Sequence, residues 1–432
     1  MRPFQIIILA IFGLVALFAL ALFASFQGFG RTQDEVGRVV IWGTIPAKQM
    51  EPAINQLIQL HKEYGQVAYV EKNATTLDSD IANAIASGSG PDLVLLNQEH
   101  LMTERARLQI IPSSSISERT FRDSFLPIFD LYLTSEGTYG IPLLVDPFVM
   151  FYNKQALQSA GIAQAPTTWE AISGLTPSLT RITDAQTITR STISMGGYEN
   201  ITNAEAMIAT LFFQAGQSIS AYTNQGVRTS LSAGGNGSFG VSSSESALNF
   251  YAEFGNPTKT TYTWSRALPT SRLMFATGDL VFYPGFASER ATITQTNPNL
   301  SFDMTAMPQP QTASVRVTYG RAYALVIPKA SKNASGAYEV ATALTQKDIL
   351  PTIARSTGMA PAVRAQLVPA TSDLYEPVFY PQALIAKGWL SPAPATLDTI
   401  FAAMIGNVTS GRLKPKDALN VADQALNAAL SQ

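Results

Sequence analysis

Short apolar runs alternate with amphipathic, helix-like segments from the first third of the chain onward. Residues 39–42, 66–71 and 93–96 have the length and the β-branched content of strands. Residues 48–62 place apolar side chains at helical spacing on one face, and residues 77–87 are followed by glycine and proline, which end helices. This order predicts a parallel, right-handed βαβαβ unit.

The remainder of the chain continues this alternation. Further strands are expected at 149–153, 280–283 and 323–327. Further helices are expected at 203–214, 335–345 and 416–430. Residues 223–244 are rich in Gly, Ser and Asn, and we expect an exposed loop or an irregular hairpin there. The pattern predicts an α/β fold.

The N-terminal segment differs from the rest because residues 4–26 carry no charge and are almost entirely apolar. As a helix this run would reach roughly 34 Å, enough for a hydrocarbon core of about 30 Å. We expect an uncleaved single-pass anchor over residues 1–30 and a tether over 31–37, although a cleaved signal remains open. Arg2 precedes the span and favours an extracytoplasmic body at the cell membrane.

Length and composition indicate a globular protein of more than one unit. The chain has 432 residues, of which 46% are hydrophobic and 14% charged. That length exceeds what one hydrophobic core usually serves, so two lobes are expected. The net charge is −2, and no block of like charge marks a nucleic-acid partner.

The absence of cysteine and the scarcity of histidine exclude several kinds of chemistry. Without cysteine there are no disulfides, thiolate nucleophiles or cysteine-ligated metals. Only His61 and His100 are present, so a three-histidine metal site cannot form. We predict no metal, cofactor or catalytic residue. His61 falls on the apolar helical face and is expected to be a core histidine, whereas His100 is expected in an ordinary loop.

Five segments resemble the maltose-binding-protein-like, carbohydrate-type group of extracellular solute-binding proteins. The most specific contains YGIPL, YNK, AGI and TWE in the order and spacing of that family. The segments are Ala86–Val94, Tyr139–Glu170, Phe275–Gly285, Ile327–Asn333 and Ser410–Leu419. Together they spread the resemblance over about residues 38–430.

The resemblance implies a periplasmic-binding-protein-like fold of two α/β lobes joined by hinge strands, with the ligand held between them. It further implies that the chain is the receptor subunit of an ABC-type importer, with permease subunits as partners and a small carbohydrate as ligand. On this basis we expect lobe one to comprise 38–146 plus 312–346 and lobe two 150–306 plus 350–432. The chain would cross between lobes near 146–149, 307–311 and 347–350.

Candidate ligand contacts are residues that follow predicted strands, because the ends of strands converge on the cleft of an α/β lobe. Trp42 ends the first strand, where it would form the floor of the cleft or join the core. Asn97 and Glu99 follow the third strand, either as polar ligand contacts or as solvated loop residues. Asp146 lies in an apolar run, where a ligand hydroxyl or a hinge partner would explain it; we favour the ligand.

The later part of the chain supplies four more candidates. Tyr283 and Phe286 flank Pro284–Gly285 after a strand. The resemblance implies that an aromatic ring at this position stacks on a sugar. Arg321 and Tyr323 follow Gly320, which would allow close backbone approach. Arg321 would reach the ligand or the opposite lobe, or else form a surface salt bridge. Because Asp146 and Glu99 are set against one arginine, we expect a neutral or nearly neutral ligand. Trp264 and Trp389 are expected to be structural.

Two other functional classes remain open on the sequence alone. A glycan-active enzyme needs only two carboxylates, although no adjacent pair marks a strand end. A membrane-tethered sensor would use the same lobes to present its ligand to a signalling partner.

Overall fold

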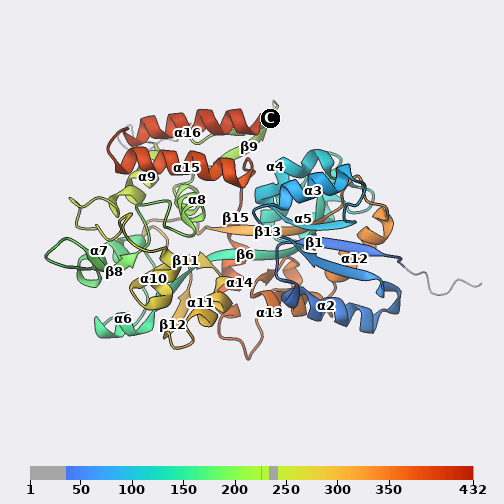
Figure 1. The fold of residues 1–432 in the computed structure, drawn as a ribbon, viewed down its shortest axis with the longest axis horizontal. Coiled ribbons are helices and arrows are strands. Elements are labelled where there is room, and N and C mark those ends of the chain that lie inside the picture. Colours follow the sequence, from blue (N-terminus) through green and yellow to red (C-terminus); the bar gives the residue numbers. More distant parts are fainter. Residues whose placement is uncertain (1–35, 225, 233–241, 432) are drawn as a thin grey trace, which may run out of the picture.

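The computed structural model describes residues 36–224, 226–232 and 242–431. An eleven-stranded sheet system runs through the molecule in the order β2-β1-β3-β13-β6-β11-β8-β7, and three short strands pair beside this path. Figure 1 shows helices gathered around the two ends of this path, with β6 and β13 running between the two groups. The expected two-lobed α/β fold is confirmed.

Lobe one is built on the predicted parallel unit. β1 (Val39–Gly43) pairs in parallel with β2 (Val67–Glu71) and with β3 (Leu93–Asn97). The connecting helices are α2 (Ala47–Leu60) and α3 (Leu77–Ala86). The smaller elements of this lobe and the helix that follows β13 are α4 (Leu101–Glu104), β4 (Ile111–Pro112), α5 (Glu118–Ser124), β5 (Gly137–Thr138) and α12 (Ala334–Leu344).

Two long strands join the lobes. β6 (Gly140–Asn153) pairs with β13 (Thr318–Val326) along its first half and with β11 (Leu280–Phe286) along its second half. Its 14 residues are almost continuously buried. The sequence indicated only residues 149–153 as a strand, because Asp146 and Pro147 interrupt the apolar run before them. A buried strand shared by both halves forms a crossing at the first of the expected hinge positions.

Lobe two surrounds the far half of β6. The remaining strands are β7 (Arg181–Ile182), β8 (Ile188–Ile193), β9 (Ser220–Thr223), β10 (Gly226–Thr229), β12 (Phe302–Thr305) and β15 (Ala386–Lys387). The helices are α6 (Lys154–Ser159), α7 (Trp169–Leu179), α8 (Ala204–Gln214), α9 (Ser243–Glu253), α10 (Ser271–Thr277), α11 (Glu289–Thr296), α14 (Glu376–Leu384), α15 (Pro394–Thr409) and α16 (Pro415–Leu430). α15 and α16 form an antiparallel pair at the top of Figure 1. The expected hairpin at 223–244 falls partly on β10 and partly outside the described residues.

Residues 350–363 pack on lobe one, although the sequence assigned them to lobe two. α13 (Leu350–Thr357) lies against α2, where Thr352 Oγ1 donates to Gln56 Oε1 at 2.7 Å. β14 (Ala360–Pro361) then pairs with the lobe-one half of β6. The third crossing therefore comes after residue 363, because the chain stays on lobe one through 347–350, where the Asp348 carbonyl accepts a hydrogen bond from Gln56 Nε2 at 2.6 Å.

Two of the segments that resemble the solute-binding family hold neighbouring elements of the fold together. Asp92 accepts hydrogen bonds from Val40 N–H at 3.1 Å and Ser331 Oγ at 3.1 Å, which ties β1 to the segment before α12. Thr168 caps α7, and Trp169 is buried with its indole N–H on Gln214. These residues hold the architecture and do not line the site described below.

Within the described residues, no helix is long and apolar enough to cross a membrane. The anchor expected at residues 4–26 lies outside the described part of the chain.

Candidate functional site

A cavity of about 190 Å³ lies where the two lobes meet. Glu99 and Arg321 line it from the β3–β13 side, and Phe286 lines it from the end of β11. The start of α8 and the start of α15 close it from lobe two, with Glu205 in the first turn of α8 and Asp398 one turn further into α15. The cavity thus combines three of the predicted ligand residues with residues at helix starts that the sequence did not indicate as ligand contacts.

Glu99 and Arg321 form an ion pair in the wall of this cavity. Arg321 Nε lies 2.8 Å from Glu99 Oε1, and the Tyr319 hydroxyl donates to the same oxygen at 2.9 Å. Burial raises the pKa of Glu99, but the charge and hydrogen bonds of Arg321 and Tyr319 outweigh it and leave that pKa below its ordinary value. The guanidinium also lies over the Phe286 ring, 4.1 Å from its centroid. Arg321 is therefore held from two sides by the protein itself.

The turn after β3 fixes Glu99 in place. Asn97 Oδ1 accepts the Glu99 backbone N–H at 3.0 Å, so this predicted ligand residue caps the turn Gln98–His100. Gln98 is fully buried, and its amide oxygen accepts the Ala322 N–H at 2.7 Å. Asn97 does not line the cavity; it positions Glu99.

Glu205 is a second carboxylate in the cavity. Its Oε1 accepts the Trp389 indole N–H at 3.2 Å. Burial, together with the nearby charge of Glu99, raises the pKa of Glu205 to about 8. Trp389 is buried and stacked on Phe401, as expected of a structural tryptophan, but it also supports a cavity residue.

Asp398 provides the third carboxylate, and Asn203 an amide. Asp398 Oδ1 accepts the Tyr198 hydroxyl at 2.8 Å. Asn203 Nδ2 donates to Glu289 Oε1 at 2.7 Å, which fixes its side chain just before α8. These groups provide hydrogen-bonding atoms along the lobe-two wall.

Tyr283 does not face the cavity, contrary to the stacking expectation. Its side chain is fully buried, with rings of Phe151 and Phe275 stacked beside it at centroid distances of 6.2 and 5.5 Å. All of β11 is buried, so the apolar pattern could not indicate which of its residues reaches the cavity. Phe286, at the end of the strand, is the aromatic residue that lines it.

Asp146 is explained by the other alternative, a partner at the hinge. Its carboxylate accepts Ser288 N–H at 3.1 Å and Ser288 Oγ–H at 2.6 Å. Burial raises the pKa of Asp146 to about 7, although the two Ser288 bonds act against this rise. Asp146 thereby connects β6 to the start of α11 and is not among the cavity-lining residues.

Trp42 and Tyr323 also lie outside the cavity lining. The Lys72 ammonium sits over the Trp42 ring, 3.6 Å from its centroid, and the ring is partly buried. Tyr323 is 7% exposed and pairs in register with Asn97 across β13 and β3. Burial raises the pKa of Tyr323 to about 12, so its hydroxyl remains protonated.

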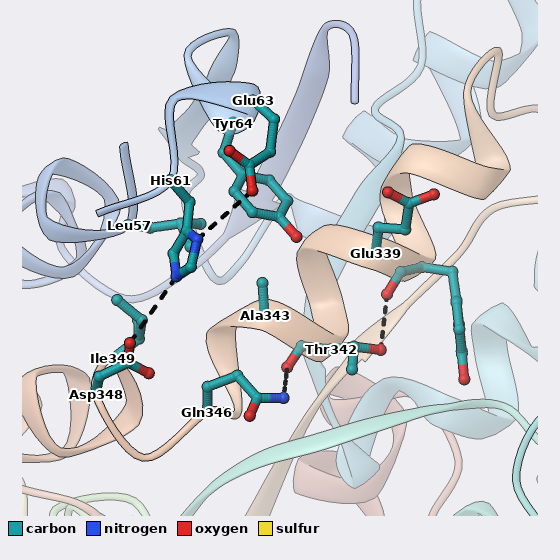
Figure 2. A pocket seen from close by; sticks show the side chains of 11 residues that line it. Leu57, His61, Glu63, Tyr64, Glu339, Thr342, Ala343, Gln346, Asp348 and Ile349 are labelled. Carbon is teal, nitrogen blue, oxygen red and sulfur yellow. Dashed lines mark hydrogen bonds and ion pairs between the residues drawn. The ribbon is translucent and has the colours of Figure 1, made fainter. Parts of the chain in front are cut away.

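The two histidines do not occupy the surroundings that the sequence indicated. His61 is 46% exposed because α2 ends at Leu60 and the backbone turns extended at His61, away from the apolar face. It borders a different cavity of about 340 Å³ on lobe one, between α2 and α12 (Figure 2). His100 is buried, with Nδ1 2.8 Å from Asp78 Oδ1, and is not an exposed loop residue.

Sequence reasoning missed Tyr198, Asn203, Glu205 and Asp398. Glu205 is the acid of the first turn of a strongly apolar helix, which is an ordinary place for an acid. Its role depends on how α8 and α15 approach the β3–β13 side, and no local signal reports that. The tryptophans Trp264 and Trp389 are both buried, as expected.

Comparison with known proteins places this architecture in a family. Residues 59–375 match the family described as bacterial extracellular solute-binding protein. The chain belongs to this family of binding proteins. A search of the curated proteins found no match.

Solved structures of sugar-binding proteins share the fold. A cyclo/maltodextrin-binding protein complexed with maltotetraose has a TM-score of 0.73 at 16% identity, covering 90% of this chain and 96% of its own. A solute-binding protein from Thermotoga lettingae bound with α-D-tagatose has a TM-score of 0.68 at 18% identity, covering 91% and 99%. The GacH receptor of Streptomyces glaucescens, solved with acarbose, has a TM-score of 0.69 at 15% identity, covering 91% and 98%.

Proposed function

We propose that this protein is the extracytoplasmic substrate-binding subunit of an ABC-type importer and that it binds a sugar or oligosaccharide between its lobes. One observation carries the proposal: the cavity takes Glu99 and Arg321 from one side and Phe286 and Asn203 from the other. Carboxylate, guanidinium and amide groups match sugar hydroxyls, and an aromatic side chain matches an apolar sugar face. A binding role also agrees with the absence of catalysis expected from the sequence.

The cavity size favours a small ligand at the point where the lobes meet. Its volume of about 190 Å³ is below the range of roughly 300–1,000 Å³ for pockets that hold drug-sized molecules. A longer chain would have to extend beyond this cavity. We therefore propose that one sugar ring occupies it.

Closure of the lobes would follow binding. A ligand that contacts Glu99 and Glu205 together favours the arrangement in which both lobes touch it. The hinge would consist of β6, β13 and the segment after residue 363. The closed, loaded form is then the form that the permease subunits distinguish from the empty one.

We also propose that residues 4–26 anchor the protein in the cell membrane by a single span, with the body outside the cytoplasm. The support is the length and uncharged character of that run. Membrane extraction and N-terminal sequencing of the mature protein test it. An N-terminus that begins after residue 19 would show cleavage in place of anchoring.

A thermal-shift screen of the full chain in detergent tests the binding function. Sugars that bind only the folded protein raise its melting temperature by mass action. We expect a shift with at least one sugar class, loss of that shift in Phe286→Ala, and no change in the recovered sugar. An altered sugar would indicate an enzyme, and a shift without uptake by the cells would indicate a sensor.

A further inference from the structure

The charges that line the interlobe cavity do not balance. Glu99, Glu205 and Asp398 contribute three carboxylates, and Arg321 is the one guanidinium among the described lining residues. That guanidinium is already paired with Glu99 at 2.8 Å and lies on the Phe286 ring. Two carboxylates therefore face the cavity without a basic partner in its lining.

Each of these two carboxylates has one oxygen fixed by the protein and one left for a ligand. Glu205 Oε1 accepts the Trp389 indole N–H, and Asp398 Oδ1 accepts the Tyr198 hydroxyl. No hydrogen bond from the described residues reaches Glu205 Oε2 or Asp398 Oδ2. The two side chains are thus oriented by neutral donors, and neither carboxyl has a basic partner in the lining when both are ionised. Water solvates Asp398, which is exposed, whereas for Glu205 burial and the nearby charge of Glu99 raise the pKa.

The N-termini of α8 and α15 offset only part of the negative charge that Glu205 and Asp398 carry when ionised. α8 begins at Ala204 and α15 at Pro394, and a helix N-terminus acts as roughly half a positive charge. Glu205 lies in the first turn of α8, but Asp398 lies beyond the first turn of α15, where this effect has fallen off, so the helix ends offset less than one of the two carboxylates. A positively charged group in the ligand would complete the balance.

We propose that Glu205 and Asp398 make this cavity selective for a sugar that carries a basic nitrogen, an amino sugar whose ammonium group sits between the two carboxylates. The inference rests on the proposed sugar-binding function and replaces the expectation of a neutral ligand. That expectation counted Asp146, which binds Ser288 elsewhere, and did not include Glu205 or Asp398.

The protonation of Glu205 makes the proposal measurable. Its pKa of about 8 means that the empty cavity holds a proton on Glu205 at neutral pH. An ammonium group stabilises the ionised carboxylate, so binding at pH 7 releases this proton and affinity rises with pH up to about 8. A neutral sugar that accepts a hydrogen bond from protonated Glu205 would instead bind more weakly above pH 8. The charged and titratable groups around Glu205 are Glu99, Arg321, Asp398, Tyr198 and Tyr319.

Calorimetric titration of the full chain in detergent tests the proposal with matched sugars. The probes are D-glucosamine, D-galactosamine and D-mannosamine, each with its neutral parent sugar and its N-acetyl derivative. We expect at least one amino sugar to bind at least about tenfold more tightly than both neutral counterparts. Titration at pH 7 in buffers of different ionisation heat should show proton release for the amino sugar alone.

Variants separate charge from shape. Glu205→Gln and Asp398→Asn keep the size of each side chain, and each should lower the ratio of amino-sugar affinity to neutral-sugar affinity by about tenfold. Glu51→Gln, an exposed acid on α2, is the matched control and should change neither affinity. If a variant folds poorly, the measurement of proton release on binding to the unmodified protein still tests the amino-sugar proposal.

Each other result has a definite meaning. Neutral sugars that bind as tightly as amino sugars, without proton release, overturn the amino-sugar inference and leave the sugar-binding function intact. Binding of no sugar of either kind overturns both. Spermidine is included as a cation without a sugar ring, and its binding in the absence of sugar binding also overturns both.

Discussion

The Glu99 carboxylate and the Arg321 guanidinium lie 2.8 Å apart and connect the turn after β3 to the crossing strand β13. The Glu99 side chain is 12% exposed and the Arg321 side chain 32% exposed, so the pair is largely withdrawn from water. Burial of one partner without the other is costly, because the remaining charge keeps its desolvation penalty. The pair is therefore a structural connection as well as part of the cavity wall.

Replacement of Arg321 should reveal that connection. In Arg321→Met the Glu99 carboxylate keeps the Tyr319 hydroxyl but loses its cationic partner. We expect the free energy of unfolding to fall by about 2 kcal/mol, as measured by urea denaturation.

The double variant Glu99→Gln with Arg321→Met should recover part of this loss, because no charge then remains unpaired. Arg316→Met, an exposed arginine just before β13, is the matched control and should stay within about 0.5 kcal/mol of the unmodified protein. Equal losses in the single and double variants would contradict the role of the pair.

The raised pKa of Asp146 predicts a specific pH dependence of stability. The folded state binds the Asp146 proton more tightly than the unfolded state, since its pKa is raised to about 7. The stabilisation that this proton contributes is present below about pH 4 and is lost as the pH rises towards 7. Asp146→Asn carries no such group, so its stability relative to the unmodified protein should improve by about 3 kcal/mol between pH 4 and pH 8.

Urea denaturation at a series of pH values measures this difference. Asp184→Asn removes an exposed aspartate and is the control; its difference from the unmodified protein should stay nearly constant with pH. A constant difference for Asp146→Asn as well would contradict the raised pKa.

The fold was predictable from the sequence wherever the local pattern of apolar residues determines whether a segment is a strand or a helix. The runs at 39–42, 66–71 and 93–96 became β1, β2 and β3, because β-branched runs between helical segments leave little choice. The assignment failed at residues 350–363, which remain on lobe one. Both lobes bury apolar faces of the same kind, so the sequence does not report which one receives α13.

The cavity lining was predictable from sequence only in part. Glu99 follows β3, Phe286 ends β11 and Arg321 lies within β13, and all three line the cavity, whereas Asp146 and Tyr283 have partners inside the protein. An acid in an apolar run needs some partner, but the sequence does not distinguish a ligand from Ser288. The remaining lining residues depend on the packing of helices that are far apart in the chain.

Gly320 is predicted to be intolerant of a side chain. A Cβ at this position would lie 2.8 Å from the Ala386 Cβ, where β15 packs beside β13. Gly320→Ala should lower the free energy of unfolding by about 1–3 kcal/mol, because β15 must move away from the crossing strand.

Gly174→Ala provides the matched control. This glycine lies inside α7, and a Cβ there meets no atom within 4 Å. Alanine is the better helix former, so the variant should gain about 0.5–1 kcal/mol in the same urea measurement. A stabilising Gly320→Ala would show that the contact with β15 yields easily.

Trp389 should report the ionisation of Glu205 directly. Its indole N–H donates to Glu205 Oε1 at 3.2 Å, and the pKa of that carboxyl is raised to about 8. When the carboxyl loses its proton, a negative charge appears beside the indole. We expect the tryptophan fluorescence of the ligand-free protein to change with pH, with a midpoint near 8, since a charge at hydrogen-bonding distance alters the emission of the ring.

Three variants assign that signal. Trp389→Phe and Glu205→Gln should each remove the transition, because the first lacks the reporter and the second lacks the proton. Trp169→Phe should keep it, since the Trp169 indole N–H binds the uncharged Gln214. A transition near pH 8 that survives Glu205→Gln would assign the ionisation to another group and remove the main support for proton release on ligand binding.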